Sequence, residues 1–303
     1  KIIDKKISVK WKGSSDTETL LYFLENFETS YVLNNLQGMF SFIFYNLNKK
    51  QLILSRDFAG EKPLYIQTCD KYISFASDIK SLSNFSKFDK KINSESMQNY
   101  LKYSYIPYPL SIYENIFKLP PASFIKIDLN EFNFLKCRSF DQFIALDGIE
   151  FVKYQNIENF ALESKYEIKH SSIESITNQA DDLITQSVNQ QLLSDAPLGA
   201  FLSGGIDSSL IVSIASKLRN NIDTFTVGFD YQHYDESKYA NEVSRHLNTN
   251  HHTYFCSKKD TLDIIPSLYD SYSEPFADSS QIPTLLISQI ASNKVKVALS
   301  GDG

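Results

Sequence analysis

The sequence is poor in cysteine and contains no Cys-x-x-Cys pair among its 303 residues. Its three cysteines, Cys69, Cys137 and Cys256, are widely separated. Such thiols offer neither a disulfide framework nor the paired ligands of a structural zinc site. We therefore interpret them as reduced cysteines with packing or surface roles.

No apolar run approaches the length of a membrane span, and the first residues do not form a signal-peptide pattern. The chain also lacks an excess of basic residues, because 30 Lys and Arg stand against 36 Asp and Glu, a formal net charge of −6. This balance disfavours a surface that binds nucleic acid. A small anionic ligand would therefore have to be bound by local groups of its own site. We expect a cytoplasmic protein without nucleic-acid or membrane partners.

The length of the chain leaves room for two domains. It begins at Lys1 rather than at Met and stops at Gly303, in a glycine-rich segment that follows an expected strand. A domain seldom ends where a ligand-binding loop should lead into its next helix. We therefore expect a fragment of a longer protein, with both domains truncated.

The first domain, expected over residues 1–135, is rich in aromatic and strand-forming residues and has an α+β pattern. Ser15 is expected to cap a helix over Asp16–Asn26, with Glu18 completing a capping box. Residues 136–172 are polar and are interpreted as an irregular interdomain connection. Two antiparallel hairpins are expected, with strands at 40–45 and 51–54 and at 65–67 and 72–75.

The second domain, expected over residues 173–303, alternates between helical and strand patterns. This alternation predicts a doubly wound parallel sheet of the α/β, Rossmann-like class, in which ligands bind at the carboxyl ends of the strands. The strands are expected at 198–202, 224–229, 253–255 and 295–299, and the helices at 173–192, 209–219, 236–247, 260–271 and 281–292.

The most informative segment is Phe-Leu-Ser-Gly-Gly-Ile-Asp-Ser-Ser at positions 201–209. A buried strand ends here, two glycines allow a tight turn and a close approach to a ligand, and a helix begins. A helix start presents unpaired N–H groups and a partial positive charge, which suit a phosphate. Asp207 adds a carboxylate that can hold Mg²⁺ beside phosphate oxygens. The plain alternative is an ordinary turn with Asp207 as a helix cap.

This segment resembles the pyrophosphate-binding loop of the PP-loop ATPases, which cleave ATP between the α and β phosphates and adenylate a carboxylate or carbonyl oxygen. The loop alone does not choose among the superfamily's asparagine, GMP and NAD synthetases and tRNA-modifying enzymes. The negative charge of the chain counts against the tRNA-modifying branch.

Further segments, in order along nearly the whole chain, resemble the glutamine-hydrolysing asparagine synthetase family. The matching segments are 15–18, 38–42, 56–65, 75–82, 113–122, 225–229, 235–237, 274–280 and 300–303. The resemblance implies a partial N-terminal nucleophile (Ntn) hydrolase glutaminase domain with αββα layers. A partial PP-loop ATP-binding synthetase domain would follow it.

The resemblance also implies a reaction: glutamine is hydrolysed in the first domain, and ammonia passes through a tunnel to the second. There, Mg-ATP activates aspartate as β-aspartyl-AMP with release of pyrophosphate, and ammonia displaces AMP to give asparagine. The implied cofactors are ATP and Mg²⁺, and the implied partners are glutamine, aspartate and ATP. A homodimer is one open alternative for the assembly.

The family's site residues carry over to positions in this sequence. Asp16 would bind the ammonium group of glutamine, and Asp207 would be a Mg²⁺ ligand. The residues implied for ATP and its pyrophosphate are Leu202, Ser203, Gly204, Gly205, Asp207, Ser208, Val227, Ser300 and Gly301. Asp302 is left open between a solvated loop acid and a catalytic residue.

The main departure is the glutaminase nucleophile, a cysteine at the mature N-terminus in the family, where this chain has Lys1. We therefore expect this fragment to catalyse neither half-reaction by itself. The identity of the carboxylate that accepts the nitrogen also stays open, because relatives amidate sugar uronic acids in surface polysaccharide synthesis or close β-lactam rings. A non-catalytic nucleotide-binding descendant is the third alternative.

Several of these residues also have plain interpretations. Asp16 can simply cap a helix, Arg56 and Asp57 can form a buried ion pair behind a hairpin, and the acidic segment 235–237 can cap the next helix. The adjacent His251 and His252 are interpreted as packed or surface imidazoles rather than metal ligands, because neighbours on a strand point to opposite faces.

Overall fold

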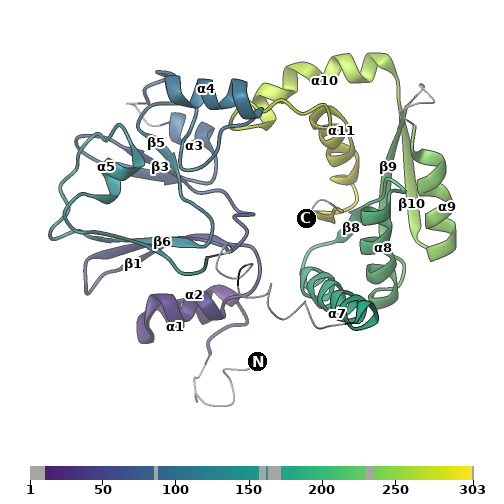
Figure 1. Ribbon diagram of the computed structural model, residues 1–303, viewed down its shortest axis with the longest axis horizontal. Coiled ribbons are helices and arrows are strands. Elements are labelled where there is room, and N and C mark those ends of the chain that lie inside the picture. Colours follow the sequence, from purple (N-terminus) through teal and green to yellow (C-terminus); the bar gives the residue numbers. More distant parts are fainter. Residues whose placement is uncertain (1–10, 85–87, 157–161, 163–171, 230–234, 302–303) are drawn as a thin grey trace. The chain divides into compact units, whose positions relative to one another are not determined.

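The computed structural model describes residues 11–84, 88–156, 162, 172–229 and 235–301 (Figure 1). The chain divides into two compact units, Lys1–Ala161 and Leu162–Gly303, and each is described by itself. In the described segments, no helix is long and apolar enough to cross a membrane.

Two antiparallel sheets form the centre of the first unit, with the strand orders β1-β2-β6-β7 and β4-β3-β5. Both predicted hairpins are confirmed, as β1 with β2 and β3 with β4. The strands are β1 (Ser41–Asn46), β2 (Gln51–Arg56), β3 (Tyr65–Thr68), β4 (Ile73–Ala76), β5 (Ile116–Lys118), β6 (Ser123–Asp128) and β7 (Ile149–Lys153). The helices are α1 (Asp16–Asn26), α2 (Thr29–Asn35), α3 (Ile79–Ser83), α4 (Ser94–Tyr103) and α5 (Phe140–Ile144).

Apolar clusters stack these elements in layers (Figure 1). Phe23 of α1 and Val32 of α2 are buried with residues of β1 and β2 on one face of the first sheet. Leu54 and Phe117 belong to the core shared by the two sheets. Leu82 of α3 is buried with strand residues of the second sheet and with partly buried residues of α4. The first unit is therefore a helix–sheet–sheet–helix stack.

Of the two hydrogen bonds in the capping box predicted at the start of α1, only the one made by Ser15 is present, so the prediction for Glu18 is wrong. Ser15 does cap the helix, because its hydroxyl accepts the Thr17 amide at 3.2 Å. The Glu18 carboxylate instead accepts the amides of Lys12 and Gly13, at 2.8 and 2.9 Å. The hydrogen bond from the Lys12 amide is the main cause of a lowered Glu18 pKa. The chain before the helix folds back and brings these two donors to Glu18.

The expectation of an irregular connection over residues 136–172 is also wrong in its first part, which contains α5 and β7. Strand β7 pairs antiparallel with β6. Phe140 and Phe143 of α5 are buried in the core shared by the two sheets. A five-residue element shows too few repeats for its period to be recognised in the sequence. This segment therefore helps to build the first unit.

The second unit contains one parallel sheet of order β10-β9-β8-β11, with helices on both faces (Figure 1). Helices α7, α8 and α9 pack on one face, and α10 and α11 pack on the other. The predicted strands and helices are all present, within a few residues of their expected limits. They are α7 (Ile173–Gln191), β8 (Leu198–Phe201), α8 (Ile206–Leu218), β9 (Asp223–Phe229), α9 (Ser237–Leu247), β10 (Asn250–Cys256), α10 (Lys258–Ser271), α11 (Gln281–Ala291) and β11 (Val297–Leu299).

The direction of strand addition reverses between β8 and β11. From β8 the chain adds β9 and then β10 on one side, and it returns to add β11 on the other side. In parallel sheets, ligands bind outside the carboxyl ends of the strands at such a switch point. Leu202 directly follows β8 and Ser300 directly follows β11, so both lie at this point.

Candidate functional site

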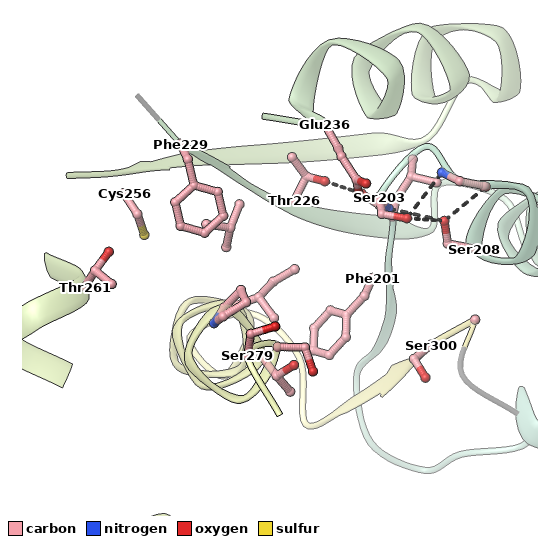
Figure 2. A pocket seen from close by; sticks show the side chains of 18 of the residues that line it. Phe201, Ser203, Ser208, Thr226, Phe229, Glu236, Cys256, Thr261, Ser279 and Ser300 are labelled. Carbon is pink, nitrogen blue, oxygen red and sulfur yellow. Dashed lines mark hydrogen bonds between the residues drawn. The ribbon is translucent and has the colours of Figure 1, made fainter. Parts of the chain in front are cut away.

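A cavity of about 830 Å³ opens at the carboxyl edge of the parallel sheet (Figure 2). The segments after β8, β9, β10 and β11 all contribute to its wall. Most of the residues predicted to bind the nucleotide line it. These are Leu202, Ser203, Gly205, Asp207, Ser208, Val227, Ser300 and Gly301.

The Ser208 hydroxyl holds the loop after β8 in shape. Ser208 is 8% exposed, and its Oγ accepts the Ser203 amide at 3.2 Å and lies 2.9 Å from Ser203 Oγ. Ser203 Oγ in turn accepts the Gly205 amide at 3.2 Å. Gly205 is the N-cap residue of α8 and has no side chain to cap the helix amides. Together with the helix dipole, the amides of the first turn suit an anion.

The two glycines of the loop have different tasks. Gly204 has a φ of 85°, and a Cβ there would lie 2.6 Å from Tyr239 Cβ and 2.7 Å from the Ala240 amide nitrogen. The first turn of α9 therefore packs directly on Gly204, which is absent from the cavity wall. Gly205 is exposed, and a Cβ there would meet only Ser203 Oγ, at 3.3 Å.

The loop after β11 packs on the start of α8. A Cβ on Gly301 would lie 2.6 Å from the Ser208 amide nitrogen and 2.9 Å from Ser208 Cα. The structure therefore brings the two predicted nucleotide loops together. Asp302 lies outside the described residues, and its role stays a prediction.

Two carboxylates line the cavity, Asp207 in the first turn of α8 and Glu236 at the N-cap of α9. Figure 2 shows Glu236 and Ser203 among the side chains that line the cavity. Within the described segments, no three His, Cys, Asp or Glu side chains form a metal cluster. One or two carboxylates are nevertheless enough for Mg²⁺, which takes its other ligands from phosphates and water.

Sequence reasoning missed Glu236 because it interpreted the whole acidic segment as a helix cap. Asp235 does have that role, since its carboxylate accepts the Ser237 amide at 3.1 Å. Hydrogen bonding to the Ser237 side chain is the main cause of a lowered Asp235 pKa. Glu236 lies in the segment between β9 and α9, which leaves the carboxyl edge of the sheet, and this position was the signal that could have found it.

The far wall of the cavity comes from α10, α11 and the segments before them, which carry no predicted site residue. Its apolar part includes Leu262, Pro283 and Ile287. Cys256 also lines the cavity and is 2% exposed, and burial raises the pKa of its thiol to about 11. Cys256 is therefore a neutral packing thiol at physiological pH, as the sequence suggested.

Two family models match the chain, a glutamine amidotransferase domain over residues 3–139 and asparagine synthase over residues 179–303. The chain is 32% identical over 291 residues to asparagine synthetase (glutamine-hydrolyzing) 1 of Bacillus subtilis, covering 95% of this chain and 42% of that protein. It is 30% identical over 305 residues to putative asparagine synthetase (glutamine-hydrolyzing) 2 of Methanocaldococcus jannaschii, covering 99% and 55%.

The chain belongs to the glutamine-hydrolysing asparagine synthetase family. It spans about half the length of the curated relatives it matches. An NMN synthetase structure from Francisella tularensis has 18% sequence identity and a TM-score of 0.31, covering 40% of this chain and 52% of that one.

In this asparagine synthetase family member, Asp16 is an exposed residue in the first turn of α1. Its carboxylate accepts the Thr17 hydroxyl at 3.4 Å, and the helix is capped by Ser15 instead. The other predicted site residues all belong to the second unit. The role of Asp16 toward glutamine therefore stays a prediction.

Arg56 and Asp57, part of another family segment, fix the turn after β2 through the backbone. The buried Asp57 carboxylate accepts the amides of Phe40, Glu61 and Lys62, at 3.2, 2.9 and 2.9 Å. The Arg56 guanidinium donates to the carbonyls of Gly60, Lys62 and Leu119, at 2.5, 2.9 and 2.8 Å. Their role is structural, but these bonds go to main-chain groups rather than forming the predicted ion pair.

The two adjacent histidines of this family member are packed, as expected. His251 Nδ1 lies 2.9 Å from Thr224 Oγ1, and His252 Nε2 lies 2.8 Å from Asp223 Oδ1. The His252 ring also stacks on Phe225, with 5.1 Å between ring centroids. Burial lowers the pKa of His251, which favours the neutral ring.

Proposed function

We propose that the protein makes asparagine from aspartate, ATP and glutamine as a carbon–nitrogen ligase. The observation that carries this proposal is the 830 Å³ cavity, where the Ser203–Ser208 loop meets Gly301 in a chain of the asparagine synthetase family. We further propose that the first unit is part of an Ntn-hydrolase glutaminase. A cytoplasmic location and a homodimer belong to the same proposal.

The phosphates of ATP would bind at the first turn of α8, between Ser203 and Ser208. The backbone of Leu202 and Val227 would contact the adenine nucleotide, and Ser300 and Gly301 would border it on the opposite side. The shape of the loop supports this placement, since side chains already satisfy the Ser203 and Gly205 amides and leave the helix start open.

The residues present fit Mg²⁺, because Asp207 is an exposed carboxylate on the cavity wall next to the phosphate loop. Glu236 is a second carboxylate on the same wall. When bound, Mg²⁺ would offset the negative charge of the pyrophosphate that leaves. A carboxylate is a poor acyl donor, so transfer of AMP to aspartate would prepare it for attack by ammonia. Asp16 would hold the glutamine that supplies this ammonia.

The reaction is tested with the complete protein, by measuring AMP and asparagine with ammonium or glutamine as nitrogen donor. We expect equal amounts of AMP and asparagine when aspartate is present, and no AMP without it. AMP formation with a sugar uronic acid and not with aspartate would show that the uronic acid, and not aspartate, is the carboxylate that the enzyme activates. Absence of AMP with every carboxylate would favour a non-catalytic nucleotide-binding protein.

The site is tested by titrating Mg-ATP into the Asp207→Ala variant. Loss of a metal-binding carboxylate should weaken the binding of Mg-ATP by about tenfold or more. It should weaken the binding of ATP without Mg²⁺ by much less. Asp182→Ala, which removes an exposed acid on α7, is the matched control and should bind as the parent does. Equal Mg-ATP affinity in the two variants would refute the assigned metal site.

A further inference from the structure

A side chain closes the end of the ladder between β8 and β9. The strand pairing stops at Phe201 opposite Phe225, and the Leu202 amide then donates to the Phe225 carbonyl at 2.9 Å. In a parallel ladder, the next hydrogen bond would run from the Val227 amide to the Leu202 carbonyl. That carbonyl instead accepts the hydroxyl of Thr226. The Thr226 side chain therefore occupies the acceptor at which the ladder would continue.

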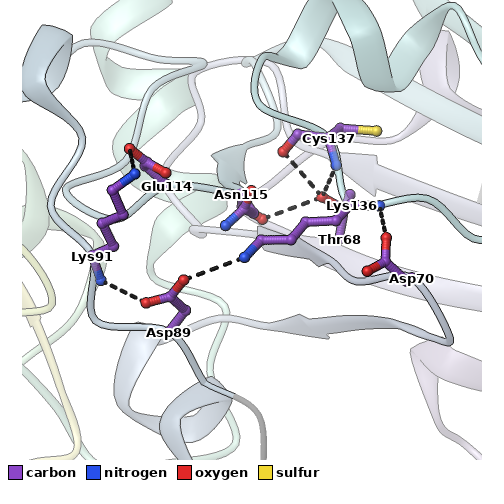
Figure 3. Close-up of polar contacts among 8 residues, drawn as sticks. All are labelled: Thr68, Asp70, Asp89, Lys91, Glu114, Asn115, Lys136 and Cys137. Atoms are coloured by element: carbon purple, nitrogen blue, oxygen red, sulfur yellow. Dashed lines mark hydrogen bonds and ion pairs between the residues drawn. The ribbon is translucent and has the colours of Figure 1, made fainter.

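Both partners of this bond are buried, and both line the 830 Å³ cavity (Figure 2). Leu202 is 1% exposed and Thr226 is 4% exposed. A buried threonine also bonds to the main chain in the first unit, where Thr68 Oγ1 accepts the Cys137 amide at 3.0 Å (Figure 3). There the hydroxyl joins two segments of the fold. The Thr226 hydroxyl acts at the wall of a proposed binding site, so it can affect a ligand as well as the fold.

The bond from Thr226 changes what the main chain of Val227 can do. Main-chain groups alternate in direction along a strand, and the Phe225 carbonyl points toward β8. The N–H and C=O groups of Val227, two residues further on, point the same way, but β8 has already ended there. Val227 lines the cavity, so a donor and an acceptor lie together at its wall. The Leu202 amide is already bonded, so the donor at this place comes from Val227.

We propose that Thr226 is a positioning residue for the nucleobase, an inference that rests on the proposed nucleotide site. By holding the Leu202 carbonyl, the Thr226 hydroxyl keeps the Val227 amide out of the ladder and available to the base. A neighbouring donor and acceptor fit adenine, whose ring nitrogen N1 accepts and whose 6-amino group donates. Hypoxanthine reverses both groups, because its N1 carries a hydrogen and its position 6 carries a carbonyl oxygen. The site therefore prefers ATP to ITP.

The first test is hydrogen exchange at the Val227 amide in the complete protein without nucleotide. Thr226→Val removes the hydroxyl and frees the Leu202 carbonyl for the Val227 amide. Exchange of this amide should slow by about tenfold in Thr226→Val and stay as in the parent in Thr226→Ser. A substitution that only destabilised the sheet would speed the exchange instead. Exchange in Thr226→Val that is equal to or faster than in the parent would overturn the proposal.

The second test is calorimetric titration with Mg-ATP, with Mg-ITP and with pyrophosphate and Mg²⁺. The parent should bind Mg-ATP at least about tenfold more tightly than Mg-ITP. Thr226→Val should reduce this preference by about tenfold, and Thr226→Ser should retain it. Pyrophosphate should bind equally to all three proteins, because the loop keeps its bonds between Ser203 and Ser208. A preference for ATP that is unchanged in Thr226→Val would refute the role of Thr226.

Thr253→Val is the matched control, because Thr253 lies opposite Thr226 on β10 and does not line the cavity. It should change neither the exchange of the Val227 amide nor the preference for ATP. If it acted as Thr226→Val does, the effect would belong to the sheet in general and the proposal would fail. A parent protein that does not bind Mg-ATP would refute the proposed nucleotide site, and this inference with it. An unchanged preference in Thr226→Val refutes the inference alone and leaves the proposed function standing.

Discussion

Gly301 lies directly against Ser208, so the loop after β11 and the first turn of α8 are in backbone contact. A Cβ on Gly301 would lie 2.6 Å from the Ser208 amide nitrogen, and no rotation of a side chain could relieve that clash. The buried Ser208 hydroxyl also organises the loop after β8. The two loops therefore meet at the residue that shapes the proposed phosphate site.

Gly301→Ala should push these loops apart and weaken Mg-ATP binding by about tenfold or more. Titration calorimetry measures the change. Gly13→Ala is the control, because a Cβ there would meet Glu18 Oε2 at an ordinary 3.5 Å, in the other unit. An affinity for Mg-ATP that is equal in both variants would show that the loop contact does not support the site.

Gly204→Ala should destabilise the second unit far more than Gly205→Ala. At position 204 a Cβ would meet the backbone of α9 and the residue would keep a positive φ, which together cost about 2–4 kcal/mol. At position 205 φ is −69° and the only close atom is a hydroxyl that can move, so about 1 kcal/mol or less is expected. Hydrogen exchange of the α8 and α9 amides compares the two, and equal protection would contradict this difference.

Asp57→Ala should lower the free energy of unfolding of the first unit by about 3 kcal/mol, because three amides would lose their acceptor in a buried turn. Trp11 is the only tryptophan and packs edge-on against Tyr22, 5.6 Å between centroids. Its fluorescence during urea unfolding therefore follows this unit alone. The control, Asp141→Ala, removes an exposed acid and should change the value by less than about 0.5 kcal/mol.

Ser257→Ala should destabilise α10 in a pH-dependent way. The Ser257 hydroxyl accepts the Asp260 amide and donates to the Asp260 carboxylate, and this second bond is the main cause of a lowered Asp260 pKa. A lowered pKa in the folded state stabilises the fold above the ordinary carboxyl pKa, and this stability is lost as the pH falls through the lowered value.

The loss of the Ser257 cap should therefore cost about 1 kcal/mol at neutral pH and less below about pH 4. Hydrogen exchange of the α10 amides at both pH values measures it. Ser271→Ala, at the exposed end of the same helix, is the control. A cost for Ser257→Ala that does not change with pH would show that Asp260 contributes nothing to the cap.

The long elements of the fold could be predicted because each repeats its pattern several times. Helix α7 shows this, since its apolar residues recur at the spacing of a helix. Helix α5 and strand β7 have only five residues each, so their burial is decided by the two sheets they complete and not by their own sequence.

The candidate site could be predicted where a short segment carries its own sequence pattern. The segment from Leu202 to Ser208 carries its pattern in order, whereas Leu262 and Pro283 reach the cavity because two helices return to one sheet edge. The role of Gly204 shows a second limit. A sequence reveals that a glycine is present, but not that α9 occupies the space a side chain would need.

The pairing of β11 with β8 has a consequence for biosynthesis. Val297 lies opposite Leu198, so these partners are 99 positions apart in the sequence. Such distant pairing is slow, because a long loop must close before any contact rewards it. On the ribosome, the nascent chain would thus display the proposed phosphate loop well before it could retain ATP, and nucleotide would begin to stabilise the newly made protein only after β11 had emerged.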